Sequence, residues 1–303
     1  MNRHFYELQF EIENSCALNC VHCSSAELRK NGSIEYSISD LLRFVSIFQN
    51  GAYIYFTGGE PLLNNDLLQI ANKIRSNNQN ARVGLYTTGN LYYHTPITSL
   101  LALEMESAGI NDCYFSLYSD IASEHDSWTT VHNSFENTVI SIQNLLTTKI
   151  VPKVHLVLNR HNKNKIEEVI DFCRNIGVKE VRILRLVLSG SAKDNWEQIG
   201  IPLSEQNEII HNLIRKQNGH ALRITYSGYP KLYPCRPFPD SIGCQAGTHL
   251  LYIDANGDVF PCACTKSNSE KFRIGHISEI ERIKEYITSH ENIQFNNDCL
   301  NAN

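Results

Sequence analysis

Three cysteines lie close together near the start of the 303-residue chain, as Cys16, Cys20 and Cys23 of the stretch CALNCVHC. No apolar run of signal-peptide or membrane-helix length occurs, so we expect a cytoplasmic protein whose thiols stay reduced. Three thiolates on one loop can hold three irons of a four-iron four-sulfur cluster and leave the fourth iron open. Structural zinc is the alternative, but it takes four protein ligands, and no fourth lies nearby in sequence.

A second motif, TGGEP at residues 57–61, follows the next predicted strand. Gly58 and Gly59 have no side chain, so the backbone there can approach another group closely. The Glu60 carboxylate can accept hydrogen bonds from an ammonium group, and Pro61 stiffens the turn. Taken alone, the motif is also compatible with a tight turn ahead of a helix.

The segments that must position these motifs alternate between β-type and helical patterns. The predicted strands are residues 5–12, 53–56, 82–86, 113–117, 153–158 and 181–186, and the predicted helices between them include 40–50, 66–77, 134–146 and 164–177. This alternation predicts parallel strands joined by right-handed crossovers. The expected fold is therefore an α/β barrel or a doubly wound sheet, and six units are too few for a complete eight-fold barrel. Both motifs follow strand ends, where parallel folds place their sites.

The pattern changes near residue 200. A helical segment at 205–217 precedes a region rich in Tyr, Pro and Gly, and then a predicted hairpin that turns at Asn256-Gly257. Five of the ten cysteines lie in this last third: Cys235, Cys244, Cys262, Cys264 and Cys299. We therefore expect a small cysteine-rich α+β domain over residues 201–303.

Composition excludes several classes of function. The chain is 42% hydrophobic and 19% charged, as in ordinary globular proteins, and its formal charge of −5 argues against a general nucleic-acid binder. No G-x-S-x-G motif supports a serine hydrolase.

The cysteine triplet, the strand–helix alternation and FTGGEP together resemble the radical S-adenosylmethionine (radical SAM) superfamily over about residues 5–190. The resemblance implies an α/β fold with a partial (β/α)6 TIM-like barrel over residues 1–200. The resemblance implies that the open iron of a four-iron four-sulfur cluster chelates S-adenosylmethionine. An electron from the cluster would then cleave the sulfonium, and a 5′-deoxyadenosyl radical would take hydrogen from a substrate. The protein would thus be an oxidoreductase-type enzyme that needs a reductase or a flavodoxin- or ferredoxin-type electron donor.

The resemblance also assigns roles to single residues. Gly58, Gly59 and Glu60 would contact the methionyl end of S-adenosylmethionine. Ser116 and Asn159 match positions of polar contacts to its ribose, and His22, where relatives carry an aromatic residue, would stack on the adenine or simply lie in the loop. TTGN at 87–90 departs from the Thr-Asn-Gly order of relatives, which puts its contact in doubt.

The arrangement C-x12-G-x4-C formed by Cys244, Gly257 and Cys262 resembles the SPASM and Twitch auxiliary-cluster domains of that superfamily. The dense run of cysteines found in full SPASM domains is missing, so the resemblance implies one auxiliary four-iron four-sulfur cluster. Its implied ligands are Cys235, Cys244, Cys262 and Cys299. Cys264 would replace one of them or donate a hydrogen atom to a substrate radical. A zinc-binding or purely structural role of this region is the alternative.

Several other residues have two interpretations. Three side chains after the fourth strand would touch substrate: His125, Asp126 and Trp128. A capped helix start is the alternative for His125 and Asp126. Arg182 and Arg185 lie on the sixth strand, where at most one need point into the barrel, and Arg185 would meet a substrate carboxylate or pair with an acidic neighbour. Cys113 and Cys173 lie on apolar faces and are expected to be small buried residues.

Two substrate classes follow from the resemblance. The first is a ribosomally made peptide that receives a crosslink, a thioether or an epimerised residue. The second is a small molecule, such as an amino sugar, that is dehydrogenated or rearranged. Few residues precede the first predicted strand, so we expect no leader-binding domain there, and a separate protein would recognise the leader. A non-catalytic iron–sulfur protein is a third hypothesis, which the intact TGGEP motif opposes.

Overall fold

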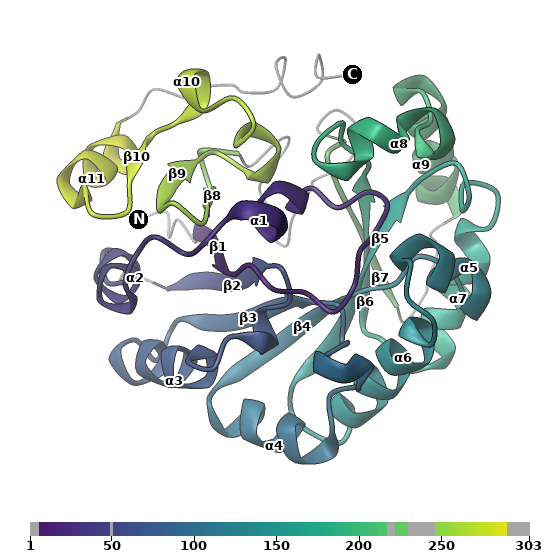
Figure 1. Ribbon diagram of the computed structural model, residues 1–303, viewed down its shortest axis with the longest axis horizontal. Helices are drawn as coiled ribbons and strands as arrows, with labels where there is room; N and C mark the ends of the chain where they lie inside the picture. Colours follow the sequence, from purple (N-terminus) through teal and green to yellow (C-terminus); the bar gives the residue numbers. More distant parts are fainter. Residues whose placement is uncertain (1–5, 49–50, 217–221, 230–245, 290–303) are drawn as a thin grey trace.

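The computed structural model describes residues 6–48, 51–216, 222–229 and 246–289. Their framework is a ten-stranded sheet with the order β10-β9-β8-β1-β2-β3-β4-β5-β6-β7, in which β1 to β7 are all parallel (Figure 1). The strands are β1 (Tyr6–Glu13), β2 (Ala52–Gly58), β3 (Arg82–Thr87), β4 (Ile110–Ser116), β5 (Val151–Leu158), β6 (Glu180–Arg185), β7 (Arg223–Ser227), β8 (Leu250–Ile253), β9 (Asp258–Phe260) and β10 (Gly275–His276). The fold is a partial parallel α/β barrel, as predicted.

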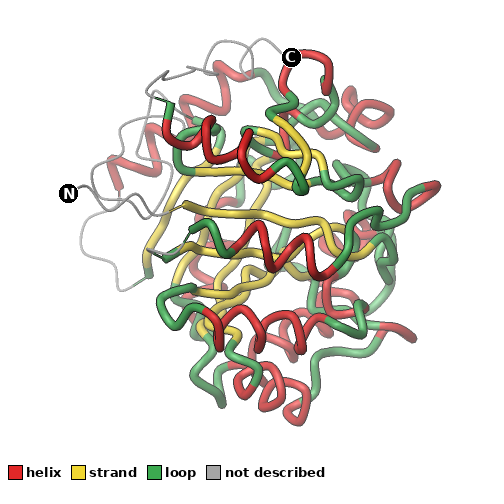
Figure 2. Tube along the Cα trace, turned by 90° about the vertical axis from the view of Figure 1, so that its left-hand side faces the viewer, coloured by secondary structure: helices red, strands yellow, loops and turns green. Residues whose placement is uncertain are grey.

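Helices surround the outer side of this sheet, and the tube in Figure 2 shows the strands enclosed by them. They are α1 (Ala26–Asn31), α2 (Ile38–Val45), α3 (Leu67–Asn77), α4 (Ser99–Ser107), α5 (Ala122–Thr129), α6 (Ser134–Leu145), α7 (Ile166–Asn175), α8 (Ser191–Ile199), α9 (Leu203–Lys216), α10 (Ser269–Phe272) and α11 (Ile280–Thr288). Three short 3-10 turns complete the set: η1 (Pro61–Leu63), η2 (Tyr92–His94) and η3 (Ala263–Thr265).

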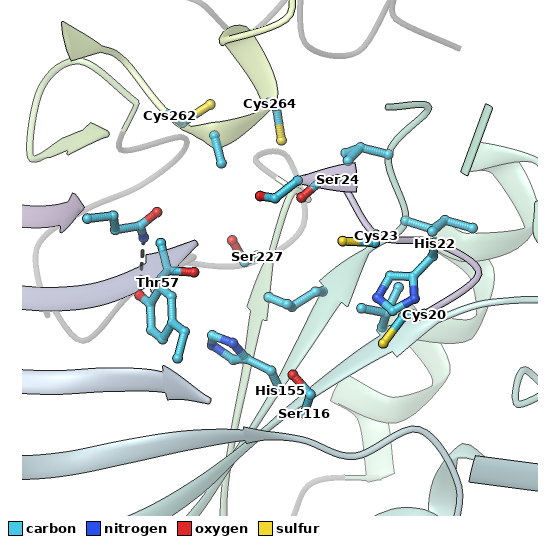
Figure 3. Close-up of a pocket in the computed structure, with 18 of the residues that line it drawn as sticks. Cys20, His22, Cys23, Ser24, Thr57, Ser116, His155, Ser227, Cys262 and Cys264 are labelled. Carbon is cyan, nitrogen blue, oxygen red and sulfur yellow. Dashed lines mark hydrogen bonds between the residues drawn. The ribbon is translucent and has the colours of Figure 1, made fainter. Parts of the chain in front are cut away.

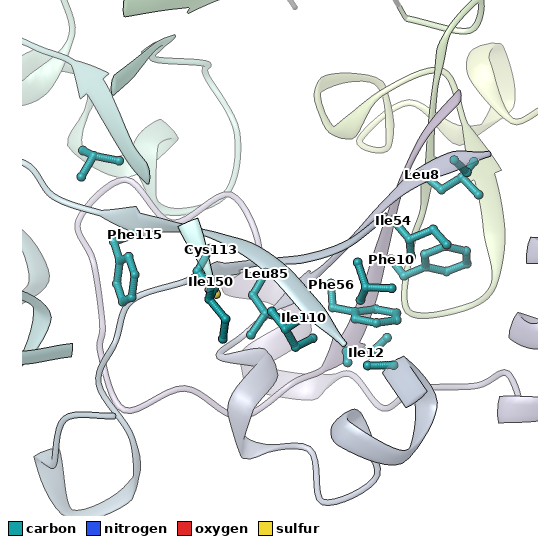
Figure 4. Close-up of a cluster of buried hydrophobic side chains, with 14 of the residues drawn as sticks. Leu8, Phe10, Ile12, Ile54, Phe56, Leu85, Ile110, Cys113, Phe115 and Ile150 are labelled. Atoms are coloured by element: carbon teal, nitrogen blue, oxygen red, sulfur yellow. The ribbon is translucent and has the colours of Figure 1, made fainter. Parts of the chain in front are cut away.

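The hydrophobic core lies between the sheet and these helices. On β1, Leu8, Phe10 and Ile12 point into it and are almost fully buried, together with side chains of β2 to β4 (Figure 4). The alternate residues Glu7 and Glu11 are also buried, but they lie outside this apolar cluster. Because side chains alternate along a strand, the pattern ELQFEIE gives β1 an apolar outer face and a polar inner face.

The six predicted strands each match an observed strand, and a seventh parallel strand extends the sheet beyond them. This strand, β7, pairs in parallel with β6 and follows α9, so the parallel sheet continues past residue 200. The division of the chain at residues 1–200 and 201–303 remains a prediction.

The last described segment joins the same sheet at its other side. Strand β8 pairs in parallel with β1, and β8 and β9 form an antiparallel hairpin. Gly257 lies in its turn with φ of 84°, a conformation that favours glycine, so the predicted hairpin is confirmed. Within the described residues, no helix is long and apolar enough to cross a membrane.

Candidate functional site

A cavity of about 370 Å³ lies at the carboxyl ends of the parallel strands. Its lining brings together cysteines from two distant loops: Cys16, Cys20, Cys23, Cys262 and Cys264. Figure 3 shows Cys20 and Cys23 on one side of this space and Cys262 and Cys264, in and beside η3, on another. The sequence separates these loops by more than two hundred residues, and the sheet order explains their meeting, since β8 lies beside β1.

The loop that carries the first three cysteines is held by backbone contacts to two helices. The Val21 amide donates to the Trp128 carbonyl over 3.0 Å, and Asn195 Nδ2 donates to the Val21 carbonyl over 2.9 Å. The Cys23 carbonyl accepts from the Ser191 amide over 3.0 Å. These bonds connect the loop to the end of α5 and the beginning of α8, so its path is set by tertiary contacts.

The thiols of this loop influence one another electrostatically. Burial, together with the charges of Cys16 and Cys23, raises the pKa of the Cys20 thiol. Burial and the nearby Glu60 raise the pKa of Cys16 to about 12, while Arg29 opposes both shifts. Thiols in such a setting become thiolates only when a cation or metal compensates their charge.

The donor set fits an iron–sulfur cluster. The described lining of the cavity contains no Asp or Glu, so soft thiolates, which suit iron–sulfur clusters, are its available anionic ligands. No three Cys, His, Asp or Glu side chains of the described residues already stand in metal-ligand geometry. The fit therefore rests on the shared cavity and on the mutual effect of the thiols.

The glycines of TGGEP pack against the segment that leads to Cys16. A Cβ atom on Gly59 would lie 2.0 Å from the Ser15 carbonyl oxygen, and one on Gly58, whose φ is 129°, would lie 2.3 Å from the Glu13 carbonyl oxygen. The Gly59 amide donates to the Glu13 carbonyl over 2.6 Å. Both glycines also line the cavity. Close approach is thus required here by the protein's own backbone, which adds to the reason expected from the sequence.

Glu60 lies beneath the cavity and is fully buried, so it is not part of the lining. Its carboxylate accepts from Thr87 Oγ1 over 2.6 Å, from the Thr88 amide over 2.7 Å and from Thr88 Oγ1 over 2.8 Å. The Leu62 amide supplies a fourth bond over 3.2 Å. Burial raises the pKa of Glu60 despite these donors. The predicted contact to an ammonium group requires one of these four donors to yield its place.

The predicted nucleotide contacts have different positions. Ser116 and His22 line the cavity, and the His22 ring lies 5.1 Å from the Trp128 ring between centroids. Burial lowers the pKa of His22 to about 4, so its ring is neutral near pH 7. Asn159 is buried outside the described lining, and its side chain bonds locally to the Val157 carbonyl over 2.9 Å. A ribose contact from Asn159 would need that local turn to open.

The three side chains after the fourth strand stabilise the scaffold and are absent from the described lining of the cavity. Asp126 accepts from the amides of Asn133 and Phe135 over 2.7 and 2.9 Å, at the start of α6. His125 is fully buried, and its Nδ1 accepts from the Tyr118 amide over 3.3 Å. Trp128 packs on His22. The helix-start interpretation therefore accounts for Asp126, and His125 and Trp128 are packed behind the cysteine loop.

Both arginines of β6 contribute to the lining of the cavity. Arg182 donates to the Tyr114 hydroxyl and lies 3.5 Å from Glu180, whereas Arg185 packs against Gly228 at the end of β7. The two side chains thus have different partners, and the expected contact of Arg185 with a substrate carboxylate remains a prediction.

The remaining cysteines divide clearly. Cys113 and Cys173 are completely buried in the apolar core, which confirms their expected packing role. Cys235, Cys244 and Cys299 lie outside the described residues, so their predicted ligand roles remain predictions.

The sequence pointed to TTGN at 87–90 but left its contact in doubt, and in the structure Thr87 and Thr88 of this motif donate to Glu60. Sequence reasoning missed Arg29, which lines the cavity. Arg29 carried no signal in the sequence, since it lies on a short helix after the triplet.

The chain belongs to the radical SAM superfamily, whose family profile matches residues 10–199, and a profile described as an iron–sulfur cluster-binding domain, SPASM, matches residues 244–302. It is therefore a radical SAM enzyme with four-iron four-sulfur clusters and S-adenosylmethionine as cofactors, and the non-catalytic hypothesis is set aside.

Curated relatives and solved structures resemble this chain over most of its length. An AdoMet-dependent heme synthase of Nitratidesulfovibrio vulgaris is 24% identical over 92% of this chain and 79% of its own. A probable GTP 3′,8-cyclase of Saccharolobus islandicus is 24% identical over 86% of this chain and 84% of its own. The crystal structure of Streptococcus suis SuiB bound to S-adenosylmethionine superposes with a TM-score of 0.70 at 15% identity, over 95% of this chain and 67% of that one. The structure of anSMEcpe with bound AdoMet and the Cp18Cys peptide superposes with a TM-score of 0.70 at 15% identity, over 97% of this chain and 82% of that one.

Proposed function

We propose that this enzyme cleaves S-adenosylmethionine at a cluster held by Cys16, Cys20 and Cys23 and takes hydrogen from a substrate bound between the two cysteine loops. The observation that carries the proposal is the single cavity that both loops line. A four-iron cluster with one open iron supplies an electron and a binding position for the methionine end of S-adenosylmethionine.

The chain's own residues would bind and orient. Arg29 opposes the raised pKa values of the Cys16 and Cys20 thiols, so its charge favours their thiolate forms. Ser116 and His22 would contact the nucleoside from the strand ends, and Glu60, held by its four donors, would keep the turn after Gly58 and Gly59 in place. Apolar lining residues such as Leu184 and Leu186 would limit water near the reacting carbon.

The second cysteine loop would hold the auxiliary cluster. Its proposed ligands are Cys235, Cys244, Cys262 and Cys299, and Cys264 is the proposed hydrogen donor. The Cys264 thiol is exposed, lines the cavity and, in Figure 3, points from its loop toward the space above the strand ends. This position supports a role toward substrate more directly than a buried ligand position would.

We propose a ribosomally made peptide as the substrate, which would receive a crosslink, a thioether or an epimerised residue. The structures of SuiB with its precursor peptide SuiA and of anSMEcpe with the Cp18Cys peptide support this class, since their folds superpose on nearly all of this chain. A separate protein would supply leader recognition, and a reductase or a flavodoxin- or ferredoxin-type donor would supply the electron.

A small-molecule substrate is the second candidate. The curated relatives named above are a heme synthase and a probable GTP cyclase, which favours it. A cavity of about 370 Å³ has a size ordinary for such ligands.

The cluster assignment is tested with a Cys16→Ala/Cys20→Ala/Cys23→Ala triple variant, with buried Cys173→Ala as the matched control. After anaerobic reconstitution we expect about eight irons in the wild type and the control, and about four in the triple variant. With dithionite and S-adenosylmethionine, the wild type and the control should form 5′-deoxyadenosine and the triple variant none. Formation of 5′-deoxyadenosine by the triple variant would refute the assignment, and loss of all its iron would refute an auxiliary cluster.

The substrate class is tested by co-expression with the short open reading frames that neighbour the gene. A peptide that loses two hydrogens has gained a crosslink or a thioether. A peptide that only incorporates deuterium from the solvent, with no other change in mass, has been epimerised. The peptide class is wrong if every neighbouring peptide stays unchanged while a deuterated small molecule from the same extract gives up its deuterium to the 5′-deoxyadenosyl radical, so that the label is found in 5′-deoxyadenosine.

A further inference from the structure

A buried carboxylate on β1 collects donors from four segments. Glu11 Oε1 accepts from Ser25 Oγ over 3.0 Å, from the Tyr252 hydroxyl over 2.6 Å and from Lys266 Nζ over 2.5 Å. Its Oε2 accepts from the Ala255 amide over 3.0 Å. Glu11 is only 2% exposed, so these partners replace water completely.

Two of the four partners of Glu11, Ser25 and Lys266, adjoin the two cysteine loops. Ser25 lies two residues after Cys23, and Lys266 lies two residues after Cys264. Lys266 Nζ also lies 3.2 Å from Ser25 Oγ, so the two loops meet directly at this carboxylate. One side chain of the central strand therefore holds both walls of the cavity.

The contact between Glu11 and Lys266 depends on the opposite charges of the two side chains. Burial alone would raise the pKa of Glu11. The charge and hydrogen bond of Lys266, together with hydrogen bonds from Tyr252 and Ser25, hold this pKa below its usual value. The ammonium of Lys266 also lies 5.3 Å from the centre of the Tyr252 ring. Removal of either charge leaves the other in a buried position, which is costly.

We propose that Glu11 and Lys266 form a positioning pair that sets the place of the Cys262–Cys264 loop relative to the Cys16–Cys23 loop. Neither side chain is among the described lining of the cavity, so the pair acts through the loops it holds. The catalytic meaning of the pair rests on the proposed function, since it matters for the reaction only if the substrate lies between these loops.

The chain offers a closely matched control. The side chains of Lys266 and Glu11 are 16% and 3% exposed, and those of Lys153 and Asp112, a second buried pair 3.3 Å apart, are 16% and 2% exposed. Lys153 lies on β5 and Asp112 on β4, and neither lines the cavity among the described residues. Lys153→Met thus breaks a buried pair of the same exposure without touching either cysteine loop.

The first experiment measures alkylation of half-buried Cys262 in the cluster-free protein by iodoacetamide, followed by peptide mass mapping. We expect Lys266→Met and Glu11→Gln to speed alkylation of Cys262 about tenfold because the loop opens more often. Lys153→Met should leave this rate as in the wild type. A Glu11→Gln/Lys266→Met double variant should show no further increase over the single variants, since both remove one interaction.

Equal acceleration by Lys153→Met would mean that only general stability is measured, and no acceleration by Lys266→Met would mean that the pair does not hold the loop. Either result overturns the proposal. In the loaded protein, Lys266→Met should also change the magnetic interaction between the two reduced clusters in electron paramagnetic resonance. The alkylation assay needs no radical chemistry, so it tests the positioning pair independently of the proposed function. Absence of 5′-deoxyadenosine in the wild type would refute the proposed function alone.

Discussion

Gly59→Ala is the substitution whose effect follows most directly from the geometry. The φ of Gly59 lies outside the left-handed region, so alanine can adopt its backbone conformation and the effect is purely steric. The new Cβ would meet the Ser15 carbonyl oxygen at 2.0 Å, where ordinary contact begins at 3.4 Å. The segment before Cys16 must therefore move by more than one ångström.

Such a movement disrupts a bond that holds the loop. The Glu60 amide donates to the Ser15 carbonyl over 2.7 Å, so a shift of this size takes the pair beyond hydrogen-bond distance. Overpacking costs about 1–3 kcal/mol and the lost hydrogen bond adds about 1 kcal/mol. We therefore expect the free energy of unfolding to fall by about 2–4 kcal/mol. Because misplacement by about 1 Å can cost about a hundredfold in rate, 5′-deoxyadenosine formation should fall by that order.

The assay pairs urea unfolding of the cluster-free protein with iron content and 5′-deoxyadenosine formation after reconstitution. Gly275→Ala is the control, because its added Cβ would meet only side-chain atoms, the nearest of them Glu279 Oε2 at 3.1 Å. The steric argument is refuted if Gly59→Ala unfolds like the wild type and forms 5′-deoxyadenosine within about twofold of it.

Three further predictions concern single side chains. His125 has a pKa of about 4 against an ordinary 6.5, so the unfolded chain binds its proton first and stability is lost as the pH falls from 6.5 to 4. His125→Phe should therefore reduce the fall in the free energy of unfolding between pH 6.5 and pH 4 by about 3 kcal/mol. A variant whose unfolding free energy falls with pH as in the wild type would contradict this prediction. Thr87→Val removes a donor from buried Glu60 and should lower the free energy of unfolding by about 1–3 kcal/mol, whereas a neutral result would mean that the bond is dispensable. Cys264→Ala should retain the wild-type iron content, and loss of about four irons would make Cys264 a cluster ligand instead.

Local features of this protein could be predicted from its sequence. The spacing of Cys16, Cys20 and Cys23 predicted that their thiols lie on one loop, and all three line the cavity. The strands β1 to β6 were visible from their β-branched and aromatic runs. The turn at Gly257 was visible because an Asn-Gly pair between apolar runs favours one kind of hairpin.

Strand β7 and the helices α4, α5 and α8 escaped prediction. α4 has a poorly segregated apolar pattern, with Leu100 and Leu103 exposed although both are leucines. Periodicity then carries little information, because the helix is stabilised by its place beside the sheet rather than by an amphipathic pattern.

The partners of buried charges were decided only by the tertiary structure. Glu60 is held by Thr87, 27 residues away, and Glu11 by Lys266, 255 residues away. The first meeting depends on β3 lying beside β2, and the second depends on β8 lying beside β1. The alternation of β1 puts Glu11 on the polar face of its strand, but alternation specifies a face and not the neighbour across it. That neighbour follows from the order of the sheet, which is set by the packing of the whole chain.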